Sequence, residues 1–188
     1  MSLVPEILQF NRGFVQRKDY EQFRTDRFPD KKLVVVTCMD TRLSELLPRA
    51  MNLRNGDAKF IKVAGAIVAH PFGSVMRSIL VAVYELGADE ILVIGHHDCG
   101  MTGLNCASIL KKAKERGVPP SVIRTLDRAG IGLEKWLVGF DDVKDGVINS
   151  VEVIKHHPLL PGDITVHGML IHPETGELEM VVDGSKSS

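Results

Sequence analysis

The sequence has few cysteines, few aromatic residues and almost no excess of either charge. Its 188 residues include three cysteines, and aromatic side chains make up 5% of the chain. A small, odd number of cysteines argues against a disulfide framework, and a chain of this length can bury a core without one. The formal net charge is −1, so the basic excess typical of nucleic-acid and anionic-membrane binding is missing. We therefore expect neither nucleic acid nor membrane among its partners.

Long apolar runs are also missing. No stretch approaches the roughly 20 apolar residues of a membrane-spanning helix, and residues 1–21 contain no apolar run of the signal-peptide type. We expect a cytoplasmic protein, in which the cysteines are open to metal binding or catalysis. The composition, 44% hydrophobic and 25% charged, is that of a globular domain.

Apolar runs alternate with helical patterns through most of the chain. The runs at 33–37 and 90–95 show no polar alternation, which is typical of strands covered on both faces. A further strand is expected at 59–63. Helices are expected at 74–86, 108–116, 121–129 and 141–156. This alternation predicts an α/β fold with a mainly parallel β-sheet flanked by helices.

The two ends of the chain complete the expected architecture. Residues 1–30 predict an N-terminal helical arm, which covers its own sheet or packs on a partner subunit. Residues 31–183 form the α/β core and end in a hairpin, so the last strand is an antiparallel edge. The polar residues 184–188 predict a flexible tail. We expect a single domain over residues 1–188.

Two polar segments follow two of the predicted strands. The segment CMDTR begins at Cys38, and the segment HHDCG begins at His96. Because ligands bind at the carboxyl ends of strands in open α/β sheets, these segments are expected to meet at one site. Cys38, His96 and Cys99 would give a three-ligand set suited to zinc, with one coordination position left free. We also expect a helix to begin after Cys99, whose dipole would favour a thiolate there.

The fourth position of this site depends on Asp40 and Arg42. If the segment is extended, both side chains project to the same side as Cys38. Asp40 would then either coordinate the metal directly or pair with Arg42 and leave the position to water. Zinc makes such a water acidic enough to supply hydroxide, although two thiolates weaken this effect and favour activity at alkaline pH.

Each of these features has a simpler interpretation when taken alone. A cysteine after an apolar strand is more often a small buried residue than a ligand. Asp40 and Arg42 alone would more often be a surface pair, and a lone His-x-x-Cys segment is common. Their conjunction at two strand ends favours zinc. Cys106 completes no motif, and we expect it to be buried and inert.

The paired motifs resemble those of the β-class carbonic anhydrases. The order CxDxR from Cys38 followed by HxxCG from His96 carries the resemblance. The VAG stretch from Val63 is similar to that family's second strand and its small-residue turn. The likeness extends over roughly the whole chain, while the specific motifs lie within residues 33–103.

The resemblance implies reversible hydration of carbon dioxide to bicarbonate and a proton by hydroxide formed at Zn²⁺. It implies Cys38, His96 and Cys99 as the zinc ligands. Asp40 and Arg42 would form a gating pair, in which Asp40 accepts a hydrogen bond from the reacting water and is a ligand in the closed form only. It also implies a homodimer or higher oligomer, with the N-terminal arm wrapping the partner.

Two departures from the family pattern leave the substrate open. Many members carry Arg-Asn where this chain has Lys62-Val63, and plant-type members have a glutamine that residues 28–32 lack. Neither departure touches the ligands. Hydrolysis of carbonyl sulfide or carbon disulfide on the same scaffold is therefore an alternative, and a non-catalytic zinc-binding protein is another.

Overall fold

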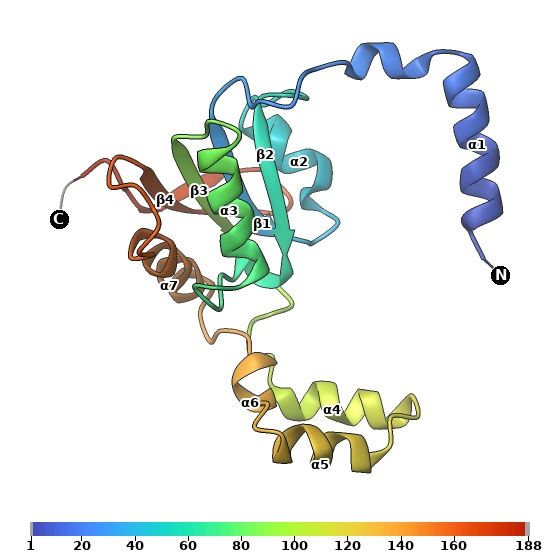
Figure 1. Ribbon diagram of the computed structural model, residues 1–188, viewed down its shortest axis with the longest axis vertical. Helices are drawn as coiled ribbons and strands as arrows, with labels where there is room; N and C mark the ends of the chain where they lie inside the picture. Colours follow the sequence, from blue (N-terminus) through green and yellow to red (C-terminus); the bar gives the residue numbers. More distant parts are fainter. Residues whose placement is uncertain (1, 187–188) are drawn as a thin grey trace.

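The computed structural model describes residues 2–186 and is built on a five-stranded sheet (Figure 1). The strand order is β2-β1-β3-β4-β5, in which only β4 and β5 pair antiparallel. The strands are β1 (Leu33–Cys38), β2 (Ala58–Val63), β3 (Glu90–His96), β4 (Thr165–Ile171) and β5 (Leu178–Val182). The predicted fold class is therefore confirmed, including the antiparallel edge strand. The predicted tail at 184–188 lies partly outside the described residues.

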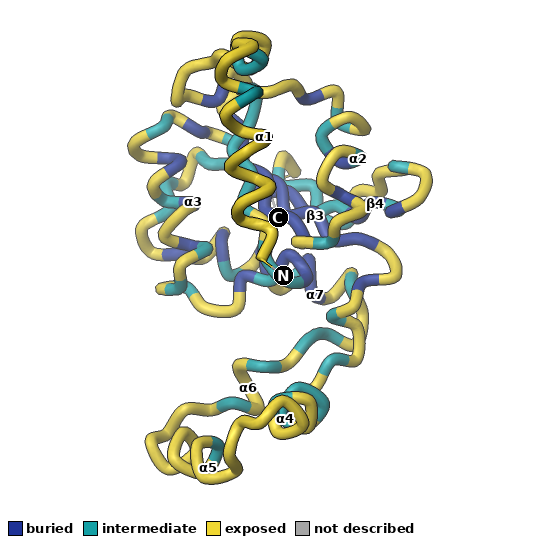
Figure 2. Tube along the Cα trace, turned by 90° about the vertical axis from the view of Figure 1, so that its right-hand side faces the viewer, coloured by how far each residue is buried: buried dark blue, intermediate teal, exposed yellow. Residues whose placement is uncertain are grey.

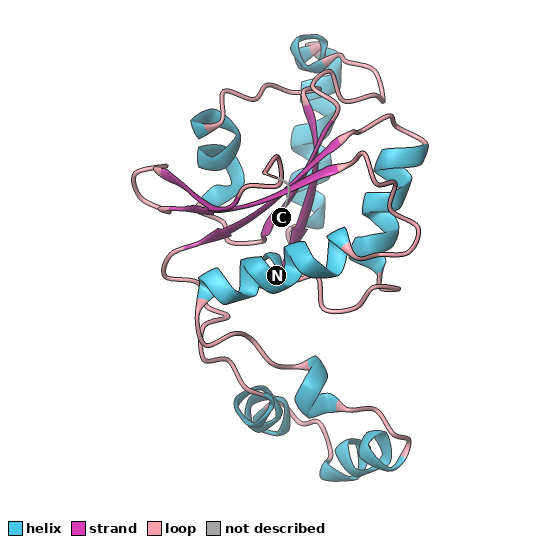
Figure 3. Ribbon diagram, turned by 90° about the vertical axis from the view of Figure 1, so that its left-hand side faces the viewer, coloured by secondary structure: helices cyan, strands magenta, loops and turns pink. Residues whose placement is uncertain are grey.

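Helices cover both faces of the sheet, as Figure 3 shows. The covering helices are α2 (Leu43–Ala50), α3 (Ser74–Tyr84) and α7 (Val143–Lys155). Alternate residues of β1 serve the two faces, because successive side chains of a strand point in opposite directions. Val34 and Val36 join the core under α3 and α7, whereas Leu33 and Val35 join the core under α2. Every residue of β1 is buried, which explains its unbroken apolar run.

Helix α2 has no counterpart among the helices expected from the sequence. Pro48 lies inside it, and proline removes a backbone hydrogen bond from a helix interior. Leu43 and Leu47 are fully buried against the sheet. Helical stability in proteins comes mainly from packing an apolar face, so this burial outweighs the cost of the proline.

The N-terminal arm extends away from the sheet (Figure 1), and most of it is coloured as exposed in Figure 2. It consists of α1 (Val4–Gln16) and the short helix η1 (Asp19–Phe23). Lys18 separates them in a left-handed conformation with a φ of 58°. Within the described part of the chain, α1 buries none of its residues. The arm does not cover its own sheet, which was one of the two roles that the sequence left open.

A group of three short helices also stands off the sheet (Figure 1). They are α4 (Cys106–Glu115), α5 (Pro120–Arg128) and α6 (Leu133–Trp136). The backbone N–H of Gly139 donates to the carbonyl of Leu104 at 2.9 Å, so the group leaves and rejoins the core at one place. The four helices expected from the sequence form within two residues of their expected ends, while α6 was not expected. Over residues 2–186, no helix has the length and apolar character to cross a membrane.

Candidate metal centre

The three predicted ligands meet at the carboxyl ends of two neighbouring strands. Cys38 ends β1 and His96 ends β3, and these strands pair in parallel with Thr37 opposite Ile94. Cys99 lies in the loop that follows β3. Parallel pairing places both strand ends at the same edge of the sheet. The topology therefore brings together residues that are far apart in the sequence.

The spacing of the donor atoms fits one metal ion. The two cysteine Sγ atoms and a ring nitrogen of His96 all lie within 4.8 Å of one another, and all three residues are buried. The two Sγ atoms are 4.0 Å apart, and both cysteines are free rather than disulfide-bonded. Two zinc–sulfur bonds of about 2.3 Å at a tetrahedral angle place the sulfurs about 3.8 Å apart. The observed separation needs little adjustment to hold such an ion.

The orientation of His96 supports the same conclusion. Its Nδ1 lies 2.8 Å from the carbonyl oxygen of His97, so Nδ1 carries the proton and donates it. Its Nε2 is buried, and among the described residues it has no hydrogen-bond partner. A buried polar atom without a partner costs about 1–3 kcal/mol. A metal bound at Nε2 removes that cost, and a backbone acceptor on the other ring nitrogen is the usual support for a metal-binding histidine.

The two thiols are electrostatically unequal. Donation from Cys99 is the main cause that lowers the pKa of Cys38 to about 4, with His96 and nearby backbone amides adding to it against the effect of burial. The pKa of Cys99 is raised, because its proton bridges to Cys38 and because burial disfavours its charged form. Cys38 is therefore the more acidic of the two thiols and the one more readily converted to the thiolate that a metal binds.

Asp40 and Arg42 pair beside the three ligands. The guanidinium of Arg42 donates from Nε to Oδ1 of Asp40 at 3.1 Å and from Nη2 to Oδ2 at 2.9 Å. The backbone N–H of Arg42 also donates to Oδ1 at 2.9 Å. These bonds lower the pKa of Asp40 to about 2. Oδ2 lies 3.8 Å from Nε2 of His96, so the carboxylate faces the ligand set while Arg42 holds it.

Arg42 has a second acidic partner, Asp98, that was not expected from the sequence. Asp98 accepts from Nη1 of Arg42 through its carboxylate at 2.9 Å, and its carbonyl accepts from Nη2 at 3.0 Å. The contact spans 56 positions of sequence. The available signal was the place of Asp98 directly before Cys99, at the same sheet edge as Arg42.

The expected helix after Cys99 does not form, and that prediction was wrong. The backbone turns there, with the N–H of Thr102 donating to the carbonyl of Cys99 at 3.0 Å, and the next helix begins at Cys106. No helix therefore begins at Cys99 to favour a thiolate there. Cys106 is buried and lies outside the ligand set.

A cavity of about 360 Å³ opens over the ligand set. Its lining residues are Cys38, Met39, Asp40, Thr41, Ala64, Gly65, Cys99, Gly100 and Met101. Gly65 lies in the short helix η2 (Ala64–Ala66) with a φ of +66°. A Cβ at this position would come within 2.9 Å of Met101, so glycine allows the backbone of η2 to lie close to Met101 at the edge of the cavity. The cavity suits a small molecule.

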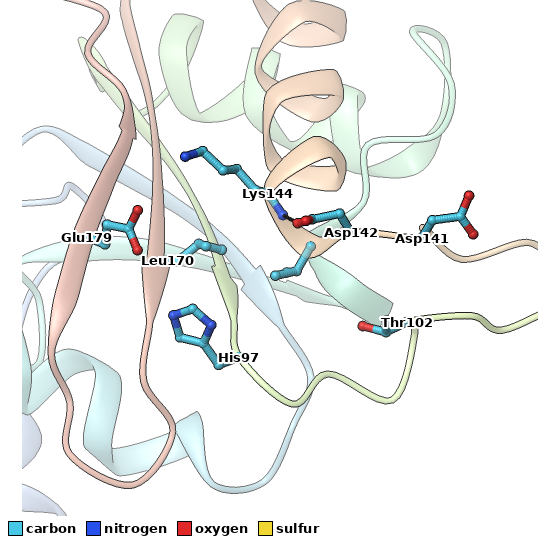
Figure 4. Close-up of a pocket in the computed structure, with 8 residues that line it drawn as sticks. His97, Thr102, Asp141, Asp142, Lys144, Leu170 and Glu179 are labelled. Carbon is cyan, nitrogen blue, oxygen red and sulfur yellow. Dashed lines mark hydrogen bonds between the residues drawn. The ribbon is translucent and has the colours of Figure 1, made fainter.

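A second cavity of about 380 Å³ lies beside His97, the residue that follows β3 (Figure 4). Its polar lining residues are His97, Thr102, Asp141, Asp142, Lys144 and Glu179. It contains none of the three ligands, and Asp142 is already used to cap α7 by accepting from the N–H of Lys144 at 2.7 Å. His97 lines this cavity while its carbonyl orients His96. Cys38 and Cys99 line the first cavity instead, so a metal held by the predicted ligands would face that one.

Comparisons with known proteins agree with this geometry. A family model described as "Carbonic anhydrase" matches residues 33–178. The "Putative carbonic anhydrase YvdA" of Bacillus subtilis is 60% identical over 184 residues, which cover 98% of this chain and 93% of that protein. A carbon disulfide hydrolase of Acidithiobacillus thiooxidans is 30% identical over 79% of this chain and 76% of its own length. The crystal structure of a β-carbonic anhydrase of Trichomonas vaginalis superposes with a TM-score of 0.88 and 34% identity, covering 98% of this chain and all of that one.

Proposed function

This chain belongs to the β-class carbonic anhydrase family, and from that premise we propose that it catalyses the reversible hydration of carbon dioxide to bicarbonate and a proton. One observation carries the proposal. A buried Cys-His-Cys set with an unpartnered Nε2 on His96 lies beside a carboxylate that Arg42 holds in its ionised form. A purely structural metal site needs a closed fourth ligand and no arginine to hold it back, which argues against a non-catalytic role.

We propose zinc as the metal, with Cys38, His96 and Cys99 as its ligands. Two soft thiolate sulfurs and one imidazole favour zinc over magnesium or calcium, which prefer oxygen ligands. When bound, zinc acidifies water and so supplies a hydroxide nucleophile near neutral pH. Two thiolates neutralise the charge of the ion more than three histidines do, so we expect the activity to increase toward alkaline pH.

The side chains around the ligands would orient the reacting water and admit the substrate. Asp40 is ionised at neutral pH, so its carboxylate can only accept hydrogen bonds. Its position beside Nε2 of His96 makes it the acceptor for the proton of the reacting water. Arg42 keeps the carboxylate in that orientation and off the metal. If Arg42 releases it, Asp40 would complete a closed set of four ligands, which blocks the reaction.

Carbon disulfide or carbonyl sulfide hydrolysis is the second candidate. The 30% identity to the carbon disulfide hydrolase of A. thiooxidans favours it, because proteins with this degree of sequence identity share the scaffold. Lys62, one of the departures from the common pattern, bonds through Nζ to the hydroxyl of Ser44 on α2 at 3.2 Å rather than lining the cavity. This departure therefore gives no reason to prefer carbon disulfide or carbonyl sulfide to carbon dioxide as the substrate.

We also propose that the chain works as a homodimer or higher oligomer in the cytoplasm. Within residues 2–186, the arm leaves large apolar side chains mostly exposed, among them Ile7, Leu8 and Phe10. Apolar faces of this kind mark protein interfaces, and a second copy is the simplest partner. The free cysteines fit a reducing compartment.

Kinetics on one zinc-loaded preparation separate the two reactions. Stopped-flow measurement gives carbon dioxide hydration, and sulfide release from carbon disulfide and carbonyl sulfide gives the alternative. Hydration with little sulfide release supports the proposal. Sulfide release without hydration would replace it with the second candidate.

A further inference from the structure

Arg42 divides its hydrogen bonds between two carboxylates. Nε and Nη2 donate to Asp40, while Nη1 donates to the carboxylate of Asp98 at 2.9 Å. Nη2 also donates to the backbone carbonyl of Asp98 at 3.0 Å. One guanidinium therefore links the side chain that faces the metal site to the residue directly before the ligand Cys99.

The backbone at Asp98 fixes this arrangement. Its φ is 54°, a left-handed conformation that aspartate and asparagine tolerate better than other side chains with a Cβ. Its side chain is 85% exposed, so it is not held there by packing. What the carboxylate contributes is its contact with Arg42, because an asparagine would satisfy the backbone equally well.

We propose that Asp98 is a positioning residue that acts through Arg42 and promotes the movement of Asp40 onto the fourth metal position. This inference rests on the proposed function and extends it. Asp98 provides Arg42 with a partner that remains when Asp40 leaves, so the guanidinium is never left without a counter-charge. The proposal requires that a part of the wild-type molecules has the closed arrangement at equilibrium.

The sign of the effect follows from the charges. With Asp40 on Arg42, two carboxylates share one cation and repel each other. With Asp40 moved away, Arg42 pairs with Asp98 alone, and that repulsion is relieved. The relief of this repulsion and the remaining Arg42–Asp98 ion pair both favour the closed arrangement. Without the charge of Asp98, Arg42 pairs with Asp40 alone, which favours the open arrangement.

Binding of a neutral ligand to the cobalt-substituted protein tests this without any turnover. Imidazole competes with Asp40 for the fourth position, and the visible spectrum of cobalt(II) reports its binding. We expect Asp98→Asn to tighten imidazole binding about two- to fivefold, the range that exposed ion pairs support. We expect Asp40→Ala to tighten it at least as much. Asp141→Asn, which removes an exposed carboxylate that Arg42 does not contact, should leave it unchanged.

A double variant shows whether the effect passes through Asp40. In an Asp40→Ala background, Asp98→Asn should have no further effect on imidazole binding. The proposal is overturned if Asp98→Asn binds imidazole like the wild type, or if its effect persists without Asp40. Either result would leave carbon dioxide hydration untouched, because that activity is measured separately on the zinc-loaded wild type.

Discussion

The distribution of protons among Cys38, Cys99 and His96 determines how this site accepts a metal. His96 donates its Nδ1 proton to the carbonyl of His97, which leaves Nε2 as the ring nitrogen for a metal. The two sulfurs lie 4.0 Å apart, and either could be the donor of their shared contact. Cys38 is the more acidic of the two thiols. Metal binding requires deprotonated ligands and therefore releases protons.

Loss of any one ligand should abolish tight metal binding. We expect Cys99→Ser and His96→Ala to weaken zinc affinity by more than about 100-fold, since even residues that only orient ligands account for 10–100-fold. Cys106→Ser is the matched control, because Cys106 is buried but lies outside the ligand set. Zinc content after dialysis against a competing chelator measures the difference. Retention of zinc by His96→Ala would contradict the assigned set.

The Asp40–Arg42 pair should also contribute to stability in a pH-dependent way. The hydrogen bonds from Arg42 lower the pKa of Asp40 from the ordinary 3.8 to about 2, so its contribution is present above about pH 4 and is lost as the pH falls toward 2. We expect wild type to be more stable than Asp40→Asn at pH 5, with a smaller difference at pH 3. Urea unfolding after chelation of metal checks this. A difference that increases on acidification would contradict the assigned pairing.

At the scale of elements, helix α7 lies very close to the sheet. A Cβ on Gly95 of β3 would come within 2.8 Å of Val147 and 3.0 Å of Val143. Gly168 of β4 faces the same helix, and a Cβ placed there would lie 2.7 Å from Val147. Glycines on the two strands thus allow α7 to pack against the sheet one residue before His96. The close packing fixes the end of β3 that carries His96, one of the proposed ligands.

Adding one methyl group at this contact should destabilise the fold. We expect Gly95→Ala to lower the free energy of unfolding by about 1–3 kcal/mol, the usual cost of overpacking a core. Gly162→Ala is the matched control, because a Cβ there meets nothing within 4 Å. Urea unfolding of both variants measures the effect. Equal free energies of unfolding for the two variants would contradict the tight packing of α7 against Gly95.

The sequence predicted those elements whose pattern is local. The apolar runs of β1 and β3 and their polar ends led to the ligand set, because strand direction alone brings those ends together. Helix α2 was missed because Pro48 argues against it locally, while the burial of Leu43 and Leu47 depends on the whole sheet. Asp98 was missed for the same reason, since its contact with Arg42 exists only after β1 and β3 pair.

At the scale of the whole molecule, the arm is the feature that a single chain does not explain. Phe10 is 69% exposed and Ile7 is 60% exposed on α1, and Figure 2 shows most of the helix coloured as exposed. Leaving these side chains in water forgoes roughly 1.5–3 kcal/mol each. Association of two chains would bury them. The cavity beside Cys38 and Cys99 is open in one chain, so association would also offer a way to enclose it.

Charges on the apolar face of the arm should therefore disrupt the oligomer. We expect the double change Ile7→Asp and Phe10→Asp to reduce the mass in solution toward that of one chain, 20.7 kDa. Gln9→Asp, which adds one charge on the same helix without removing an apolar side chain, is the control. Light scattering coupled to size-exclusion chromatography gives the masses. A wild-type protein that already runs as a single chain would contradict the proposed assembly.

Stopped-flow carbon dioxide hydration between about pH 7 and pH 9 tests the central claim most directly. We expect zinc-loaded wild type to be active, with a rate that increases toward about pH 8.5–9 because two thiolate ligands weaken the acidification of water. Asp40→Ala should be slower by about 100-fold or more, the lower range for a positioned acid–base group, and Arg42→Ala should also be slower because Asp40 is then free to close the site. A wild-type protein that holds one zinc per chain and shows no hydration above buffer at about pH 8.5–9 would contradict the account.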